Sequence, residues 1–315
     1  MVKRRIGIFL VLACFCLYLV PFYVQAISTS DAKTPVSVDE RCSLTISYGF
    51  EGIPFSDLPV SLYKIADVSE DFQYTFVDSF ADSKLIINGI KTQGEWNVIR
   101  STLETYIVAN SVEADYSATT DQSGKVSFDA LNTGLYLAIN QPITQDGFRY
   151  SFDSALFALP NLDTEGNWQY RVEATAKTQA IPPADDDIEY KVLKLWKGDL
   201  GSPDRPQSIE IEIFRNEISH ETVTLSNENN WTYSWKAEDD GAQWKVIERN
   251  VPAGYIMTVE ERETAFVLTN TLEDEPDDPI PSTGDTSNVL IYVILMIISG
   301  FILVFIGKTG KRTDL

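Results

Sequence analysis

Residues 208–213 alternate strictly between polar and apolar side chains, and this pattern constrains the fold more than any other feature of the chain. Three isoleucines occupy alternate positions, and Glu210 and Glu212 lie between them. Because successive side chains of a β-strand point to opposite faces, the pattern predicts a strand with one buried and one hydrated face. The apolar face of such a strand has to be buried against a second layer of secondary structure. We therefore expect an all-β protein built of packed sheets.

Similar strand patterns occur on both sides of residues 179–187, a segment with paired prolines and an acidic run. This composition indicates a linker, so we expect one domain over 27–178 and a second over 188–272. In the first domain, strands are predicted at 43–48, 60–65, 125–128, 134–139 and 168–175. In the second domain, they are predicted at 189–196, 208–214, 222–225, 231–235, 245–247 and 266–270. Short strands at this density, over about 85 residues, are typical of an immunoglobulin-like sandwich.

One helical pattern interrupts the strands of the first domain, near residues 94–110. Four apolar residues recur there at helical spacing: Trp96, Ile99, Leu103 and Ile107. Thr92, followed three residues later by Glu95, has the sequence of a capping box. The apolar stripe predicts a helix that covers one face of the first sandwich.

Both ends of the chain carry apolar segments that indicate export. Residues 1–26 combine a basic start, an apolar run and a small-residue cleavage site, as in a secretory signal peptide. Residues 289–306 carry no charge, and about 18 residues at a rise of about 1.5 Å nearly span a hydrocarbon core of roughly 30 Å. The basic tail that follows is expected to stay in the cytoplasm. We therefore expect 273–283 to form an acidic, extended stalk outside the cell and 284–315 to form a membrane-spanning sorting segment.

Cysteine and charge content narrow the chemistry of the exported part. Cys14 and Cys16 lie in the signal peptide, so Cys42 alone remains and no internal disulfide can form. Lipoprotein-type cleavage at Cys14 is the weaker alternative, because it would leave half of the apolar run attached. The net charge of −21 repels nucleic acid and anionic lipid. His220 is the only histidine, which argues against histidine catalysis and a histidine metal site, so no metal and no cofactor is expected.

Five blocks of sequence follow one another in the second domain: KLW, RPQSIEIEIF, VTLSNENNWTYSW, WKVIERNVPAGY and AFVLTN. In this order they resemble the collagen-adhesin B-type (Cna B) domain of Gram-positive surface proteins, over residues 190–271. The resemblance implies an intramolecular isopeptide bond between Lys194 of the first strand and Asn270 of the last, promoted by Glu248. Lys191 is the competing lysine, but its opposite parity places it on the other face of the strand.

The three residue types suit this reaction. Lys194 has to lose its proton before it can attack, and burial beside an aromatic residue such as Trp196 lowers the pKa of a lysine by disfavouring its charged form. Glu248 is expected to keep its proton and to donate it to the carboxamide oxygen of Asn270. Ammonia then leaves, so the cross-link is permanent and the protein is no turnover enzyme. By analogy with a disulfide, closing a loop of about 76 residues stabilises the domain by roughly 4 to 5 kcal/mol.

Three blocks of the first domain, together with its helix, resemble the N-terminal domain of Gram-positive pilins: VSLYKIADV, TDQSGKVSFDALNTGLYLAIN and LPNLDTEGNWQYRVEATAK. The first strand of this domain, CSLTISY, has no lysine, so no isopeptide bond is expected there. Lys64 is interpreted as an edge lysine with a partly buried stem.

Lys177 is a candidate for joining one subunit to the next. In backbone pilins, a tyrosine-proline-lysine-asparagine motif supplies the lysine that attacks the neighbouring subunit. The corresponding stretch here, VEATAKTQ, keeps Lys177 and lacks the other three residues. The resemblance therefore leaves the polymerising role of Lys177 open.

A short turn before the membrane segment resembles a sortase sorting signal, and it consists of Ile280, Pro281, Ser282, Thr283 and Gly284. A turn just outside the bilayer is accessible, and Pro281 fixes its backbone. The resemblance implies cleavage between Thr283 and Gly284, followed by transfer of the Thr283 acyl group to the cell wall or to a pilin lysine. An ordinary single-pass anchor with a chance turn is the alternative.

Together these features predict a cell-wall-anchored structural protein, foremost a backbone or basal pilus subunit that sortase attaches. Its partners would be sortase and either cell-wall peptide or other pilin subunits. The alternative is an adhesin that does not polymerise and binds a host protein or glycan through the first domain. A secreted enzyme is disfavoured, since the sequence offers no nucleophile with a base, no metal cluster and no phosphate loop.

Overall fold

The computed structural model describes residues 32–145, 147–181, 187–199 and 205–273. The predicted signal peptide, the sorting turn and the membrane segment lie outside these residues, as does the stalk beyond residue 273. Within the described part of the chain, no helix is both long enough and apolar enough to cross a membrane.

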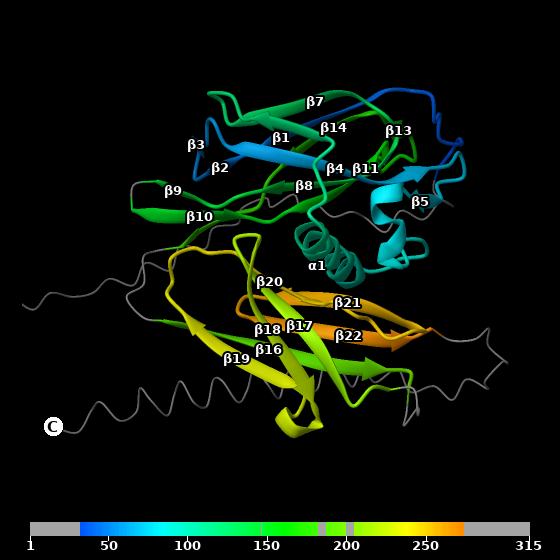
Figure 1. Cartoon of the computed structure of the whole chain (residues 1–315). Helices are drawn as coiled ribbons and strands as arrows, with labels where there is room; N and C mark the ends of the chain where they lie inside the picture. The colour runs from blue at the N-terminus through cyan, green and yellow to red at the C-terminus, as the bar shows by residue number, and fades with distance from the viewer. Residues whose placement is uncertain (1–31, 146, 182–186, 200–204, 274–315) are drawn as a thin grey trace, which may run out of the picture. The chain divides into compact units, whose positions relative to one another are not determined.

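The first domain is a β-sandwich with one long helix (Figure 1). Its elements are β1 (Cys42–Ser47), β2 (Gly49–Phe50), β3 (Ile53–Pro54), β4 (Pro59–Val68), β5 (Tyr74–Phe76), the 3-10 helix η2 (Asp78–Ser83), α1 (Gln93–Asn110), β6 (Tyr116–Thr119), β7 (Lys125–Leu131), β8 (Gly134–Asn140), β9 (Ile143–Gln145), β10 (Phe148–Phe152), β11 (Ala155–Leu159), β12 (Asn161–Leu162), β13 (Trp168–Gln169), β14 (Arg171–Thr175) and β15 (Thr178–Ile181). One sheet has the order β14-β1-β7, and the sheet opposite has the order β11-β8-β4-β5 with β6 also paired to β4. A smaller sheet, β15-β10-β9, extends the domain.

The two main sheets enclose a core of apolar side chains that come from alternate positions of their strands. Its buried members include Leu44, Ile46, Val60, Leu62, Val126, Phe128, Tyr136 and Phe157. This is the packing that the period of two predicts, with one face of each strand buried.

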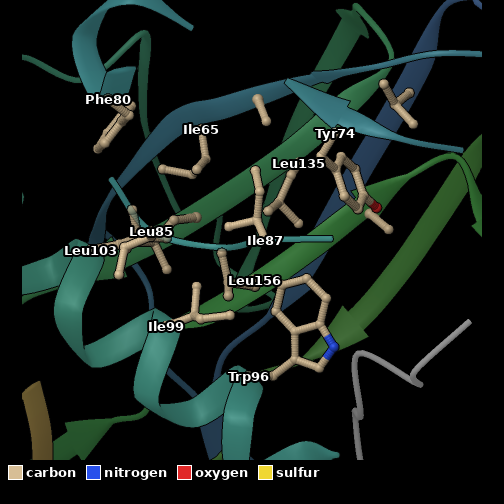
Figure 2. Packing of buried hydrophobic residues seen from close by; sticks show 14 of the residues in the cluster. Ile65, Tyr74, Phe80, Leu85, Ile87, Trp96, Ile99, Leu103, Leu135 and Leu156 are labelled. Carbon is tan, nitrogen blue, oxygen red and sulfur yellow. The ribbon is translucent and has the colours of Figure 1, made fainter. Parts of the chain in front are cut away.

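Helix α1 covers the outer face of the second sheet. Trp96, Ile99 and Leu103 point from the helix toward Leu135 and Leu156 of the sheet (Figure 2). The helix begins with a capping box, in which the Thr92 hydroxyl accepts from the Glu95 N–H at 3.2 Å and the Glu95 carboxylate accepts from the Thr92 N–H at 2.9 Å. The apolar stripe therefore packs against the first domain, and the cap fixes where the helix starts.

The second domain is a sandwich of one mixed sheet and one antiparallel sheet. Its elements are β16 (Ile188–Lys197), β17 (Ser208–Arg215), β18 (Ile218–Ser226), the 3-10 helix η3 (Asn227–Asn229), β19 (Thr232–Ala237), β20 (Trp244–Glu248), β21 (Tyr255–Arg262) and β22 (Ala265–Leu272). One sheet has the order β19-β16-β22-β21 and the other has the order β18-β17-β20. The first strand, β16, runs parallel to the last strand, β22. The prediction of an all-β protein with β-sandwich domains is confirmed.

Strand β21 was not among the predicted strands. Its sequence, YIMTVEER, begins with three large apolar residues in a row and ends in charges, so it lacks a clean period of two. Strand β15 also departs from the sequence interpretation, because it carries the chain to Ile181, inside the predicted linker 179–187. It pairs with β10 of the first domain.

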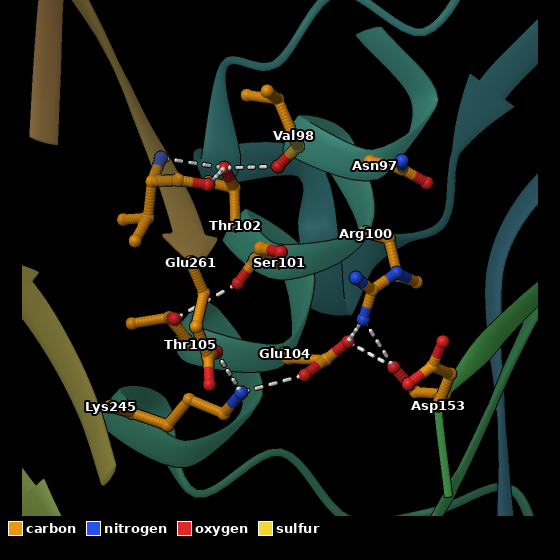
Figure 3. A network of polar contacts seen from close by, with 12 residues as sticks. Asn97, Val98, Arg100, Ser101, Thr102, Glu104, Thr105, Asp153, Lys245 and Glu261 are labelled. Atoms are coloured by element: carbon orange, nitrogen blue, oxygen red, sulfur yellow. Dashed lines mark hydrogen bonds and ion pairs between the residues drawn. The ribbon is translucent and has the colours of Figure 1, made fainter. Parts of the chain in front are cut away.

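The second face of α1 contacts the second sandwich, and both sandwiches belong to one compact unit that ends at Glu273. The Thr102 hydroxyl accepts from the backbone N–H of Val259 in β21 at 2.8 Å. The Lys245 ammonium in β20 donates to the Glu104 carboxylate at 2.7 Å, as Figure 3 shows. Helix α1 is thus packed between an apolar surface of the first domain and a polar surface of the second.

Candidate functional site

Lys194, Glu248 and Asn270 come together inside the second sandwich. Lys194 lies on β16 and Asn270 on the neighbouring strand β22, where the parallel register pairs Lys194 with Leu268 and Trp196 with Asn270. Lys194 and Asn270 therefore share the inward face of one sheet, two positions apart. Glu248 ends β20 of the opposite sheet. The sandwich fold thus brings three residues from distant parts of the sequence to one point.

Glu248 contacts both of the other residues. The Lys194 Nζ donates to Glu248 Oε2 at 2.5 Å, and the Asn270 Nδ2 donates to Glu248 Oε1 at 3.1 Å. The carboxyl group consequently bridges the amine and the carboxamide. A group in this position can exchange protons with both.

The site is closed to solvent. The side chains of Lys194 and Glu248 are 0% exposed, and Asn270 is 0% exposed as a residue. Burial lowers the pKa of Lys194 to about 8, although the nearby Glu248 carboxylate acts in the opposite direction. The loss of hydration thus outweighs the attraction, and the neutral amine becomes accessible near neutral pH.

Asn270 has one buried atom without a hydrogen-bond partner in the described structure, the carboxamide oxygen Oδ1. A half-turn of the carboxamide exchanges Oδ1 and Nδ2. Oδ1 then faces Glu248 and can accept a hydrogen bond from the protonated acid, which polarises the carbonyl carbon for attack. Leaving Oδ1 unpaired costs free energy, so this exchange is favoured when Glu248 holds a proton.

Aromatic rings surround the lysine side of the site. The Lys194 Nζ lies 4.9 Å from the centroid of the Trp196 ring. Trp231 and Tyr255 pack edge-on against Trp196, with ring centroids 5.4 Å and 5.3 Å away. Sequence reasoning identified Trp196 through its parity with Lys194 but missed Trp231 and Tyr255. Both lie in the sequence blocks that carry the family resemblance, and this position could have indicated that they belong to the site.

The other residues singled out from the sequence lie apart from this cluster. Lys177 is 70% exposed between β14 and β15, and its Nζ lies 3.0 Å from a carboxylate oxygen of Asp153. Lys64 forms an ion pair with Asp67 and is largely buried. Lys191 is half-buried on β16. Burial raises the pKa of the Cys42 thiol to about 11, so this cysteine stays protonated in the core of the first domain. The predicted sortase residues 280–284 lie outside the described part of the chain.

These observations define a class of domain: an immunoglobulin-like sandwich whose first and last strands are neighbours and hold a buried lysine and asparagine, with a glutamate between them. Residues 190–271 match the model of the Cna protein B-type domain family. The second domain is therefore a Cna B-type domain, as its sequence blocks predicted.

Solved structures with similarity to the chain include surface proteins and pilins of Gram-positive bacteria. A single B repeat unit of the collagen-binding surface protein Cna of Staphylococcus aureus matches at 14% identity, over 75% of this chain and 100% of that one, with a TM-score of 0.26. The major pilin SpaD from Corynebacterium diphtheriae matches at 14% identity, over 75% of this chain and 65% of that one, with a TM-score of 0.30. The shaft pilin SpaA from Lactobacillus rhamnosus GG matches at 10% identity, over 77% and 100%, with a TM-score of 0.25. TM-scores this low do not establish a common arrangement of the whole chain. No curated protein matches the sequence.

Proposed function

We propose that this protein is a structural subunit of the Gram-positive cell surface whose second domain is cross-linked by an isopeptide bond between Lys194 and Asn270. The observation that carries the proposal is the buried contact of Glu248 with both residues, at 2.5 Å and 3.1 Å. A buried lysine, acid and amide have little value as a stabilising cluster, because each loses its hydration. Their burial together is explained when they react with one another.

The reaction follows from the positions of the three groups. Glu248 takes a proton from the Lys194 ammonium, and the neutral amine attacks the Asn270 side-chain carbon. A bond forms between Lys194 Nζ and that carbon, and the bond from the carbon to Nδ2 breaks. Glu248 returns its proton to Nδ2, which leaves as ammonia, and the Glu248 carboxylate then takes the second proton that Nζ has to lose when it becomes an amide nitrogen. No oxidant or cofactor is required, and one event per chain completes the reaction.

The bond has a mechanical consequence. It ties β16 to β22, the first and last strands of the second domain. Tension applied to the two ends of this domain then passes through covalent bonds and leaves the strand ladders unloaded. A protein without internal disulfides gains by this bond the resistance that an exposed position outside the cell requires.

Intact mass tests the cross-link. The exported chain is expected to be one ammonia lighter than its sequence mass, and Glu248→Ala and Lys194→Ala should restore the full mass. Lys191→Ala is the matched control, since this lysine lies on the same strand with opposite parity, and it should leave the ammonia loss unchanged. A wild-type chain of full sequence mass would overturn the proposal.

We further propose that sortase attaches the chain through 280–284 and that Lys177 accepts the next subunit. The 70% exposure of Lys177 supports the second part, since an acceptor amine has to reach an enzyme-bound partner. Denaturing gels of cell-wall extracts should show a ladder of high mass that Lys177→Ala abolishes, whereas Lys125→Ala, another exposed lysine of the first domain, should keep it. A single wall-linked band in the wild type would indicate instead a basal subunit or an adhesin that does not polymerise.

A further inference from the structure

A second polar cluster lies beside the reactive site, at the end of β16. Arg205 holds Asp199 through two hydrogen bonds, from Nε to Oδ2 at 2.7 Å and from Nη2 to Oδ1 at 2.5 Å. The Tyr255 hydroxyl donates to the same Oδ2 at 2.8 Å. Asp199 is only 3% exposed, so this carboxylate is buried and triply bonded. A paired geometry of this kind fixes the plane of the guanidinium group.

This cluster reaches the reactive site through Trp196. The Arg205 guanidinium carbon lies 5.5 Å from the centroid of the Trp196 ring, and the Lys194 Nζ lies 4.9 Å from the same centroid. Tyr255, which binds Asp199, also packs on Trp196 at 5.3 Å. One indole ring therefore contacts both the reacting amine and the Arg205–Asp199 pair.

Ring contacts hold this indole in place. Its N–H is buried and has no hydrogen-bond partner among the described residues. Trp196 is also only partly buried, so it lies between the closed site and the solvent. Arginine suits the task of holding such a ring, because its planar cation stacks on aromatic faces and never loses its charge.

We propose that Arg205, oriented by Asp199 and Tyr255, is a positioning residue for the cross-linking reaction, because it fixes Trp196 over the Lys194 amine and keeps water from it. This inference rests on the proposed isopeptide bond. Arg205 touches neither reacting atom and acts through the ring. Since Trp196 is also the register neighbour of Asn270, a displaced ring would disturb both sides of the bond that forms.

Loss of Arg205 has two expected effects on the reaction. Water that enters beside a loosened Trp196 restores part of the hydration of the Lys194 ammonium, so the neutral amine becomes rarer and the reaction slower. The pH above which the Lys194 and Glu248 pair loses its single proton also moves upward from about 8. Glu248 is the charged group that contacts Lys194 directly. Arg205 contacts the Trp196 ring, and Asp199 and Tyr255 are hydrogen-bonded to each other beside that ring.

The test follows bond formation over time in the full chain. A short cell-free synthesis in detergent, quenched in denaturant, gives unreacted protein, and dilution into buffers on both sides of pH 8 starts the reaction. Intact mass reports the fraction that has lost ammonia. For Arg205→Met we expect a rate about threefold to tenfold lower near neutral pH, which is the range that the loss of one cation–π contact supports. The pH above which the rate falls should move upward, and Arg205→Lys should restore the rate in part.

Arg215→Met is the matched control. Arg215 also lies over a tryptophan of this domain, 5.9 Å from the Trp244 ring centroid, and is also paired with an aspartate, Asp240. It should leave the rate and its pH dependence unchanged. If Arg205→Met lowered the rate of ammonia loss without changing its pH dependence, Arg205 would act only in folding and the inference would be overturned. A rate equal to the wild type would overturn it as well, and a wild type that never loses ammonia would overturn the proposed function itself.

Discussion

In the proposed cross-linking reaction, Lys194 and Glu248 hold one proton between them before the attack. Attack needs the neutral amine, and polarisation of the Asn270 carbonyl needs the protonated acid. This pair of neutral groups carries the same number of protons as the ammonium and carboxylate pair. Transfer of a proton from Lys194 to Glu248 therefore prepares the reaction. The surrounding solution does not have to supply or remove a proton.

The sign of the pH dependence follows from this proton count. The pKa of Lys194 is about 8, so above that pH Lys194 has lost the proton that the proposed reaction passes on to Glu248. The rate of bond formation should be level just below pH 8 and should fall as the pH rises through it. Intact mass at fixed times after refolding measures this rate. A rate that instead rises through pH 8 would mean that loss of the lysine proton alone limits the reaction.

The three residues of the candidate site could be singled out from the sequence, but their surroundings could not. Lys194 and Trp196 share the parity of one strand, and the resemblance of the sequence blocks to the Cna B-type domain indicated Lys194, Glu248 and Asn270. Asp199 and Arg205 follow β16 outside any periodic pattern. Their contact with Trp196 depends on the path of the chain after the strand, which no local rule determines.

At the scale of elements, helix α1 covers the outer edge of β21. Strand β21 is the last strand of its sheet, so the backbone groups of its free edge need partners. The Thr102 hydroxyl accepts from the Val259 N–H at 2.8 Å and donates to the Val98 carbonyl at 2.7 Å. A side chain of one domain thereby completes a hydrogen bond that the sheet of the other domain leaves open.

Substitution of Thr102 tests this edge cover. Thr102→Val keeps the shape of the side chain but leaves the buried Val259 N–H without a partner, which should lower the free energy of unfolding by about 1 to 3 kcal/mol. Thr102→Ser retains the hydroxyl and should cost less. Denaturant unfolding of both variants measures the difference. A larger loss for Thr102→Ser than for Thr102→Val would show that the methyl group, and not the hydrogen bond, stabilises the contact.

The burial of the polar side of α1 could not be predicted from the sequence. Its apolar stripe predicted packing on the first domain, which Trp96, Ile99 and Leu103 provide. Ser101, Thr102, Glu104 and Thr105 are also buried, although such residues normally form a hydrated helix face. The partners of Thr102 and Glu104 on β21 and β20 lie 157 and 141 residues away in the sequence. Local periodicity contains no information about such contacts.

At the scale of the whole compact unit, a buried charge network joins the two sandwiches. Glu104 accepts from Lys245 of the second domain at 2.7 Å and from Arg100 of its own helix at 2.5 Å. Lys245 also donates to Glu261 at 2.6 Å (Figure 3). The Glu104 side chain is 9% exposed. Removal of one member leaves a buried charge with fewer partners, so we expect the network to make the stability of each domain depend on the other.

Lys245→Met should therefore destabilise the protein by about 3 kcal/mol, at the lower end of the cost of breaking a buried ion pair, since Arg100 still neutralises Glu104. The double variant Glu104→Gln with Lys245→Met should be less destabilised than the sum of the two single variants, because the same contact is lost in both. Arg262→Met is the control: its ion pair with Glu260 is 43% and 25% exposed and should contribute less than about 1 kcal/mol. Denaturant unfolding provides the values. A strictly additive double variant would mean that the two charges are not coupled.

The same network predicts how the protein responds to acid. Burial alone would raise the pKa of Glu104, but Lys245 and Arg100 outweigh it and lower the pKa from 4.5 to about 2. A carboxyl group whose pKa is lower in the folded state contributes stability that is complete above pH 4.5 and is lost as the pH falls toward 2. At about 1.4 kcal/mol for each pKa unit, this contribution is on the order of 3 kcal/mol. Glu104→Gln cannot titrate, so its free energy of unfolding should fall less steeply than that of the wild type between these pH values. If the two curves ran parallel, the acid response would have to come from other carboxylates, and the interface between the sandwiches would not depend on the charge of Glu104.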